Sequence, residues 1–463
     1  MAAAFSTETI PVELWQEILL RVPTKDVARS CCVSTQWRDI VRDPSFRKLH
    51  HDRHATAHDV PDALLVATYN IDSQRVASVF PVELAAVSPT PSTRTATAPI
   101  CRVNHIEGYR IANICNGFLC FASHSTAKVI VHNPVTGERL EVPRAPRLPP
   151  DQDNARSPVT FALGFSPTTG VYKLFRFTNR TMDVYTLGRG AESTGWRQHA
   201  LPLHPCNLVE SKPAVVIGGK ICMATIGPAP YRHPADIGTP GPVLVVDVAH
   251  EEPCTYSPPD YGLPWADAAV SVFELHGRLC LAIRTERMIQ FWTMPVEEDD
   301  DDQPWQLLYK FTFDVDDEII RFNQFQRLVP MSAWLDGHTN TLCYREGNNV
   351  YRKYVGTTTA TVRRFSSTKV VIMSWDSKIC LPVAPSSLSS FQWDIYAGYR
   401  PTLLSPLTFA SEQHEEDDNK CDLFIRSLLR TLRSQKSQKC RPSPTSAGCT
   451  DAKRICCINP RGF

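Results

Sequence analysis

Residues 10–49, IPVELWQEILLRVPTKDVARSCCVSTQWRDIVRDPSFRKL, carry the pattern from which the rest of the chain can be interpreted. Leu14, Ile18 and Val22 recur at every fourth position, which predicts an apolar face on a first short helix. Pro23 ends that helix, because a proline inside a helix removes a hydrogen bond and clashes with the preceding turn.

Two further helices are predicted in the same stretch. Thr24 can cap the second helix and Ser34 the third, since a hydroxyl oxygen at this position accepts a hydrogen bond from a free backbone N–H. The third helix carries Trp37 and ends at Asp43-Pro44. About forty residues bury too little surface to be very stable alone. We therefore expect this three-helix unit to rest on a partner.

Matches to one known motif are spread over the whole stretch: Ile10-Pro11, Glu13, Ile18-Leu19, Arg21-Val22-Pro23, Val33-Ser34, Trp37-Arg38, Asp43-Pro44 and Phe46. In these residues the stretch resembles an F-box. It departs from the family pattern at Ile10, Val27 and Gln36. The resemblance implies docking onto a Skp-family adaptor, which links the chain to a cullin scaffold. The residues expected to bind the adaptor are Ile10, Pro11, Leu14, Trp15, Ile18, Leu19, Val22, Pro23, Val33 and Trp37.

An anonymous helical cap or a DNA-binding helix-turn-helix is the alternative interpretation of three short helices. A DNA reader needs a basic recognition helix. The third helix offers Arg38 and Arg42, but Asp39 and Asp43 offset their charge. The whole chain has 49 basic and 48 acidic side chains, so we expect neither nucleic acid nor a membrane surface as a partner.

The sequence indicates an intracellular chain. The first residues, MAAAFSTETI, lack the basic start and apolar core of a signal peptide, and no apolar run is long enough to span a bilayer. Many of the 16 cysteines stand inside apolar strands, where a thiol acts as a small hydrophobe. We expect a cytoplasmic and/or nuclear location, without disulfides.

Beyond residue 108 the chain repeats one short unit, a tight turn followed by an apolar strand that contains cysteine. The repeats are Asn116–Cys120, Gly218–Cys222, His276–Cys280 and a degenerate Thr341–Cys343. Short strands that recur with a period of roughly fifty residues are typical of a β-propeller. The predicted blades lie at 108–143, 159–202, 213–257, 269–313 and 329–366, with a sixth that combines 63–85 and 368–400.

The same region resembles the F-box-associated domain of plant F-box proteins. The matching groups are Asn116-Gly117-x-Leu119-Cys120, Asn133-Pro134-x-Thr136-Gly137-Glu138, Gly164-Phe165-x-Pro167, Tyr172-Lys173-Leu174, Trp196-Arg197 and Pro401-x-Leu403-Leu404-Ser405-Pro406. We expect an α+β multidomain chain, a three-helix F-box followed by an all-β propeller of about six blades. The expected boundaries are a disordered N-terminus 1–9, the F-box 10–49, linker and first strands 50–107, the propeller 108–410 and a disordered tail 411–463.

Enzyme and metal signatures are missing from the sequence. It contains no G-x-S-x-G elbow, no phosphate-binding G-x-x-x-x-G-K-[ST] and no H-E-x-x-H. His50, His51, His54 and His58 lack a Cys or carboxylate at a known ligand spacing, so a solvated helix end is the expected reading. We expect no metal, no cofactor and no catalytic residues. The resemblance implies a non-catalytic substrate-recognition subunit of a ubiquitin ligase.

Strand alternation predicts where a protein target would bind. In an up-and-down blade, successive connections switch faces, so the segments 144–158, 227–241, 258–268 and 314–328 should share one face. Long loops on a rigid scaffold are where recognition concentrates, and Arg, Tyr and Trp are favoured anchors. The candidates are Arg156, Tyr231, Arg232, Tyr261, Trp265 and Phe322. The alternative is a propeller that binds glycans or small molecules, or acts as an enzyme, with the F-box as an assembly module only.

Overall fold

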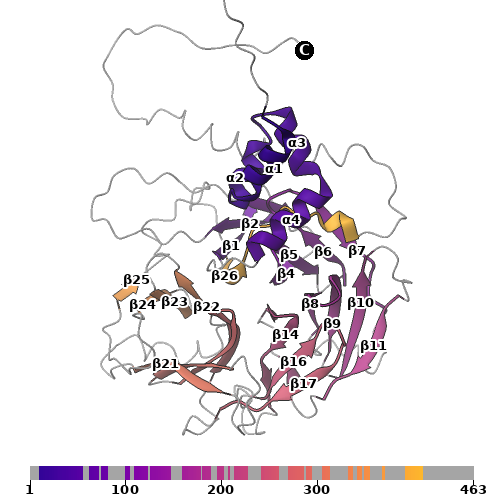
Figure 1. Ribbon diagram of the computed structural model, residues 1–463. Coiled ribbons are helices and arrows are strands. Elements are labelled where there is room, and N and C mark those ends of the chain that lie inside the picture. The colour runs from indigo at the N-terminus through magenta and orange to yellow at the C-terminus, as the bar shows by residue number, and fades with distance from the viewer. Residues whose placement is uncertain are drawn as a thin grey trace, which may run out of the picture.

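The computed structural model describes most of the helical region and the strands of the propeller. The described residues are 10–55, 62–71, 74–81, 100–104, 109–123, 126–147, 159–178, 180–188, 195–202, 207–208, 213–227, 241–259, 269–285, 288–294, 305–312, 332–336, 341–346, 349–354, 368–370 and 392–409. In this part of the chain, the helices lie at one side of a ring of β-sheets (Figure 1).

Within residues 10–55, which the structure describes, the N-terminal region folds into four helices, one more than the sequence predicted. They are α1 (Val12–Leu20), α2 (Thr24–Ser30), α3 (Thr35–Arg42) and α4 (Pro44–Ala55). The fourth helix arises because Asp43-Pro44 starts a helix as well as ending one. The carboxylate of Asp43 accepts a hydrogen bond from the Phe46 N–H at 2.9 Å, and Pro44 has no N–H to leave unpaired in the first turn.

The predicted helix caps are partly wrong. Pro23, not Thr24, is the N-cap of α2, and Thr24 is the first residue inside the helix. Ser34 does occupy the N-cap of α3, but its side chain makes no capping hydrogen bond. The hydroxyl of Thr24 is directed instead to a carbonyl of the C-terminal region, that of Pro401 at 3.2 Å.

Among the described strands, five antiparallel four-stranded sheets follow one another along the chain and are blades of a propeller. Blade 1 contains β4 (Tyr109–Cys115), β5 (Phe118–Ser123), β6 (Val129–His132) and β7 (Arg139–Val142). Blade 2 contains β8 (Thr160–Ser166), β9 (Val171–Phe177), β10 (Thr181–Leu187) and β11 (Arg197–Ala200). Blade 3 contains β13 (Val215–Ile217), β14 (Lys220–Met223), β16 (Val243–Asp247) and β17 (Pro253–Tyr256).

The last two of these blades have the same strand order. Blade 4 contains β18 (Ala269–Leu275), β19 (Arg278–Arg284), β20 (Met288–Thr293) and β21 (Gln306–Thr312). Blade 5 contains β22 (Ser332–Asp336), β23 (Thr341–Glu346), β24 (Asn349–Tyr354) and β25 (Thr368–Val370). A small two-stranded sheet pairs β12 (Asn207–Leu208) with β15 (Thr225–Ile226).

A sixth sheet, the closing blade, joins the two ends of the propeller. Its strand order is β26-β1-β2-β3, where the C-terminal β26 (Gln392–Tyr399) pairs antiparallel with the N-terminal β1 (Asp62–Ile71). The other two strands are β2 (Gln74–Pro81) and β3 (Cys101–Asn104). Among the residues that the structure describes, six blades and closure by strands from both ends of the propeller are confirmed. The sequence missed β3, and it placed the 368 region in this blade, whereas β25 belongs to blade 5.

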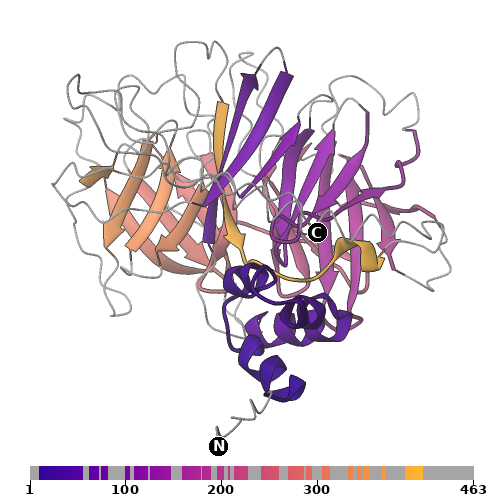
Figure 2. The ribbon, with the colours of Figure 1, turned by 90° about the horizontal axis from the view of Figure 1, so that it is seen from above.

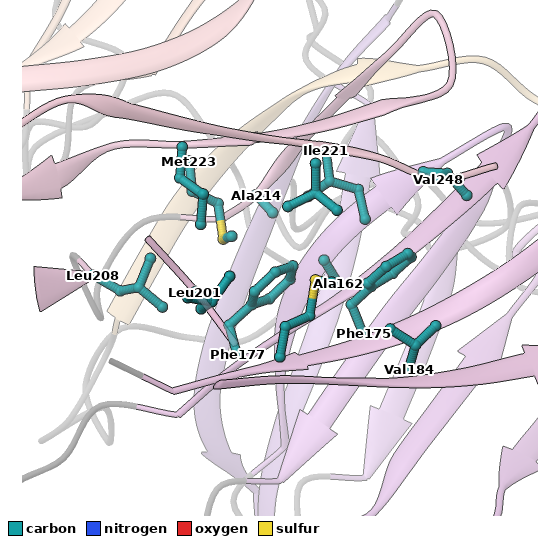
Figure 3. Packing of buried hydrophobic residues seen from close by; sticks show 13 residues of the cluster. Ala162, Phe175, Phe177, Val184, Leu201, Leu208, Ala214, Ile221, Met223 and Val248 are labelled. Atoms are coloured by element: carbon teal, nitrogen blue, oxygen red, sulfur yellow. The ribbon is translucent and has the colours of Figure 1, made fainter. Parts of the chain in front are cut away.

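Apolar side chains fill the space between adjacent blades. Between blades 2 and 3, Phe175 and Phe177 of β9 pack with Ile221 and Met223 of β14 (Figure 3). The four repeated strand cysteines, at 120, 222, 280 and 343, are buried, and the nine cysteines that the structure describes are free thiols. None of the helices within the described ranges is long and apolar enough to cross a membrane.

Removing the strand that closes the ring is expected to disrupt the propeller. A chain that ends at residue 391 lacks β26, so the edge of β1 is left unpaired and the core loses the buried side chains of Ile395 and Tyr399. We expect this chain to lose its cooperative thermal transition and to aggregate, as judged by calorimetry and size-exclusion chromatography. A chain that ends at residue 410 is the control and should melt as the full chain does. Equal melting of both truncated chains would contradict closure by β26.

Candidate functional site

Helix α1 exposes apolar side chains on one face. Leu14 and Ile18 lie one turn apart and are 55% and 47% exposed. Val33, in the connection between α2 and α3, is 73% exposed. Several large apolar side chains that face solvent on one small helical unit are typical of an interaction surface.

Six of the ten residues predicted for adaptor binding are exposed: Ile10, Pro11, Leu14, Ile18, Pro23 and Val33. Val12, which the sequence reasoning missed, is also exposed. Val12 is the first residue of α1, but it does not fit the i, i+4 spacing by which Leu14 and Ile18 were predicted. Ile10, Val12, Leu14, Ile18 and Val33 are called the apolar docking surface below.

The other four predicted residues belong to the body of the helical unit. Leu19 is buried at 2% exposure in the core of the four helices, so it supports the surface from below. Trp15, Val22 and Trp37 are half-buried and pack against that core. The rings of Trp15 and Trp37 contact each other with centroids 4.9 Å apart, so each tryptophan holds α1 and α3 together.

Three histidines of α4 are structural rather than a solvated helix end. His50 is fully buried, and its Nε2–H donates to the Val22 carbonyl at 3.0 Å. Its ring stacks on His54 with centroids 4.3 Å apart. Burial lowers the pKa of His50 to about 4, and the neighbouring His54 and His51 act in the same direction against the Val22 hydrogen bond. His58 lies outside the described residues, and the described ones contain no group of three metal-ligating side chains.

The helical unit is held to blade 1 by a nearly buried ion pair. Arg47 of α4 and Glu138, which precedes β7, lie 3.3 Å apart, and each side chain is 10% exposed. Arg47 also donates from Nε to the Val41 carbonyl at 2.9 Å. Removal of either side chain would leave the other charge buried without compensation, so this pair specifies how α4 sits against blade 1.

The helices lie at the propeller face on which the first-to-second and third-to-fourth strand turns lie (Figure 2). The β6–β7 turn, residues 133–138, is on this face, which we call the F-box face. The strands that flank segments 144–158, 227–241, 258–268 and 314–328 end on the opposite face. The six predicted target-binding residues, Arg156, Tyr231, Arg232, Tyr261, Trp265 and Phe322, lie outside the described residues.

A second group of charged residues joins blades 2 and 3. Glu251 accepts hydrogen bonds from Lys173 at 2.8 Å, from Arg197 at 2.5 Å and from His199 at 2.8 Å. Burial alone would raise the pKa of Glu251, but the hydrogen bonds from Arg197 and Lys173 lower it to about 2. Because this one carboxylate accepts hydrogen bonds from all three side chains, we infer that the cluster holds blades 2 and 3 together.

The innermost strands enclose a small cavity on the propeller axis. Its polar lining includes Glu274 of β18 and Asp394 of β26. Each carboxylate already has an arginine partner, Arg400 at 2.7 Å for Glu274 and Arg345 for Asp394. These carboxylates therefore tie β26 to blades 4 and 5.

Comparison with known families and proteins identifies relatives for both parts of the chain. The family described as F-box associated beta propeller domain matches residues 82–365, and the F-box domain matches residues 8–49. The chain is 25% identical to the F-box protein At2g43440 of Arabidopsis thaliana over 391 residues, which cover 81% of this chain and 85% of that protein.

Other relatives match over shorter segments. The Arabidopsis thaliana protein At1g47790, also named as an F-box protein, is 31% identical over 212 residues, or 41% of this chain and 46% of the relative. The chain thus spans about half the length of this relative. Among solved structures, the β-propeller domain of Myceliophteria thermophila Cps50 (Swd1) matches with a TM-score of 0.31 and 12% identity, over 67% of this chain and 91% of that one.

The buried His50 makes the helical unit sensitive to acid. Its folded pKa of about 4 lies below the ordinary value of 6.5, so the neutral ring contributes stability above pH 6.5, and this contribution is lost as the pH falls from 6.5 to 4. Between pH 7.5 and 5.5 we expect a loss on the order of 1 kcal/mol in the free energy of unfolding. Urea unfolding at both pH values measures it. In the His50→Phe variant this part of the loss should be absent. An identical pH dependence of the free energy of unfolding in wild type and variant would refute the assignment.

Proposed function

This chain belongs to the F-box proteins that carry an F-box associated β-propeller domain, and on this premise we propose that it is a substrate-recognition subunit of a Skp–cullin–F-box ubiquitin ligase. In this role the four helices bind a Skp-family adaptor, which connects them to a cullin scaffold. The propeller binds a protein target. The chain itself makes and breaks no covalent bonds, and it acts by holding the target near the transfer enzyme, which raises the effective concentration.

The apolar docking surface carries this proposal. A helix that already uses Leu19 for its own core, yet exposes Leu14 and Ile18 one turn apart, has apolar area that water disfavours and a partner would cover. Val33 extends the exposed apolar set to a second segment of the helical unit. Burial of these side chains by an adaptor is favourable, and it does not draw on the residues that form the F-box core.

The proposed target site lies on the face opposite the helices. The F-box face is occupied by α4 and the contact between Arg47 and Glu138. A target bound at the other face can reach the propeller without displacing the adaptor. We place the target on segments 144–158, 227–241, 258–268 and 314–328 because they connect strands on that face.

We also propose that the protein works in the cytoplasm or nucleus. Cys120 and Cys280 are fully buried as free thiols inside strands, and burial raises the pKa of each thiol. Such thiols serve packing and suit a reducing compartment. Immunolocalisation of the tagged protein, with a secreted or vesicular distribution as the contrary result, tests this location.

Leu14→Asp is expected to abolish adaptor binding while leaving the chain folded. Because Leu14 is more than half exposed, a carboxylate there costs little in the free chain, but in the complex it would be buried without a partner, at a cost of at least about 2 kcal/mol. Co-purification and calorimetric titration with a Skp-family adaptor measure the loss. Glu13→Gln, at the neighbouring exposed position, is the control for a change of charge beside the surface. Wild-type adaptor affinity in Leu14→Asp would exclude the proposed function.

Tyr231→Ala combined with Arg232→Ala, or Trp265→Ala, is expected to release the target without affecting the adaptor. Truncation of an aromatic or arginine anchor at an interface typically costs about 2 kcal/mol or more. Proteins captured by wild type and by the variants, with proteasome activity blocked, are compared by quantitative mass spectrometry. If replacing the acidic segment 297–302 with Gly and Ser releases the target and these substitutions do not, the target binds the F-box face instead.

A further inference from the structure

The chain crosses between the helices and the propeller a second time after β26. Residues 400–405, here called the strap, leave the closing blade and run along the F-box face to the short helix η4 (Pro406–Phe409) (Figure 2). The strap therefore lies in contact range of both parts of the molecule, far in sequence from the helices that it meets.

Leu403 of the strap is part of the F-box core. It is completely buried, and it packs in the same cluster as Leu19, Val27 and Val41 of the helices. Val135 of the β6–β7 turn packs against this cluster from the propeller side. The four helices thus share their core with one residue from the C-terminal region and one from blade 1.

Asn133 fastens the strap to blade 1. Its Nδ2 group donates to the carbonyls of Thr402 at 3.0 Å and Leu404 at 2.6 Å. Its Oδ1 atom accepts from the backbone N–H groups of Val135 at 2.8 Å and Thr136 at 3.3 Å. One fully buried amide therefore shapes the β6–β7 turn with its oxygen and holds the strap with its nitrogen.

The helices hold the other side of the strap. Thr24 donates to the Pro401 carbonyl at 3.2 Å, and His51 Nδ1 lies 3.1 Å from the Thr402 hydroxyl. The fit against blade 1 is close: a Cβ atom at Gly117 would come within 2.3 Å of the Arg400 carbonyl oxygen. The strap is therefore enclosed on both sides by side chains and backbone that would have to move together.

We propose that the strap fixes the F-box in one orientation on the propeller, with Leu403 and Asn133 as its positioning residues. Building on the proposed function, this would set a constant geometry between the adaptor and a target held on the opposite face. Ubiquitin transfer depends on how the reacting groups are placed, so a fixed orientation favours it over a freely swinging F-box. Because Leu403 is part of the F-box core, that core is complete only when the last propeller strand and the strap are in place.

The orientation can be measured on the full-length chain without adaptor or target. Cys32 of the helical unit and Cys254 of β17 are exposed and serve as attachment points for spin labels. Cys101 and the cysteines outside the described ranges are replaced by serine: Cys206, Cys380, Cys421, Cys440, Cys449, Cys456 and Cys457. We expect one narrow distribution of label distances by double electron–electron resonance.

Two different variants should broaden that distribution. Leu403→Ala removes the strap's side chain from the F-box core. Asn133→Asp keeps the oxygen that shapes the turn but turns the donor toward Thr402 and Leu404 into an acceptor. Leu279→Ala makes the same truncation in a buried position of blade 4, away from the strap, and should keep the distribution narrow. Leu403→Met, which preserves most of the apolar volume, should restore the narrow distribution.

The results separate this inference from the proposed function. A broad distribution in wild type would overturn the fixed orientation. A narrow distribution in both Leu403→Ala and Asn133→Asp would overturn the role of the strap in fixing it. If Leu403→Ala gives no soluble protein, Asn133→Asp decides alone. Adaptor titration of the wild type is a separate measurement: its failure would remove the proposed function and leave the distance result intact.

Discussion

The pairing of β26 with β1 is the constraint on which the rest of the structure depends. The innermost strand of the closing blade comes from the C-terminal end of the propeller, and the next strand comes from its N-terminal end. Asp62 is paired with Tyr399, so the chain enters and leaves the ring at the same face. The F-box precedes the entry and the strap follows the exit. Closure therefore brings these two segments together, although more than 300 residues separate them in sequence.

Up-and-down strand order then separates two surfaces. Turns that connect first to second and third to fourth strands fall on the F-box face, where residues 133–138 meet the helices through Glu138 and Val135. The remaining connections fall on the other face, because each antiparallel strand reverses the direction of the chain. The proposed adaptor-binding module and the proposed target-binding surface can thus share one ring without competing for space. The separation follows from topology and needs no particular side chain.

Local and repeated patterns were predictable from the sequence, and contacts distant along the chain were not. The recurring turn and cysteine-containing strand located four of the blades, because the same position of each of these blades is buried against its neighbours. The spacing of Leu14 and Ile18 identified an apolar stripe on α1, but it could not tell which apolar residues face the core, so the buried Leu19 was included among the predicted adaptor-binding residues. Leu403 was noticed only as part of a motif, since no periodicity links it to helices at the other end of the chain. The loops expected to bind a target lie outside the described residues and stay a prediction.

The shared core explains how so short a helical unit can leave apolar side chains at its surface. About forty residues have a limited supply of large apolar side chains, and each one turned toward a partner is lost to the internal core. In this chain Leu14 and Ile18 face solvent, while Leu403 and Val135 supplement the core from outside the helices. The propeller thus supplies stability that the F-box would otherwise need from its own residues. The dependence of the F-box on the ring and the exposure of its apolar surface are therefore two consequences of one packing arrangement.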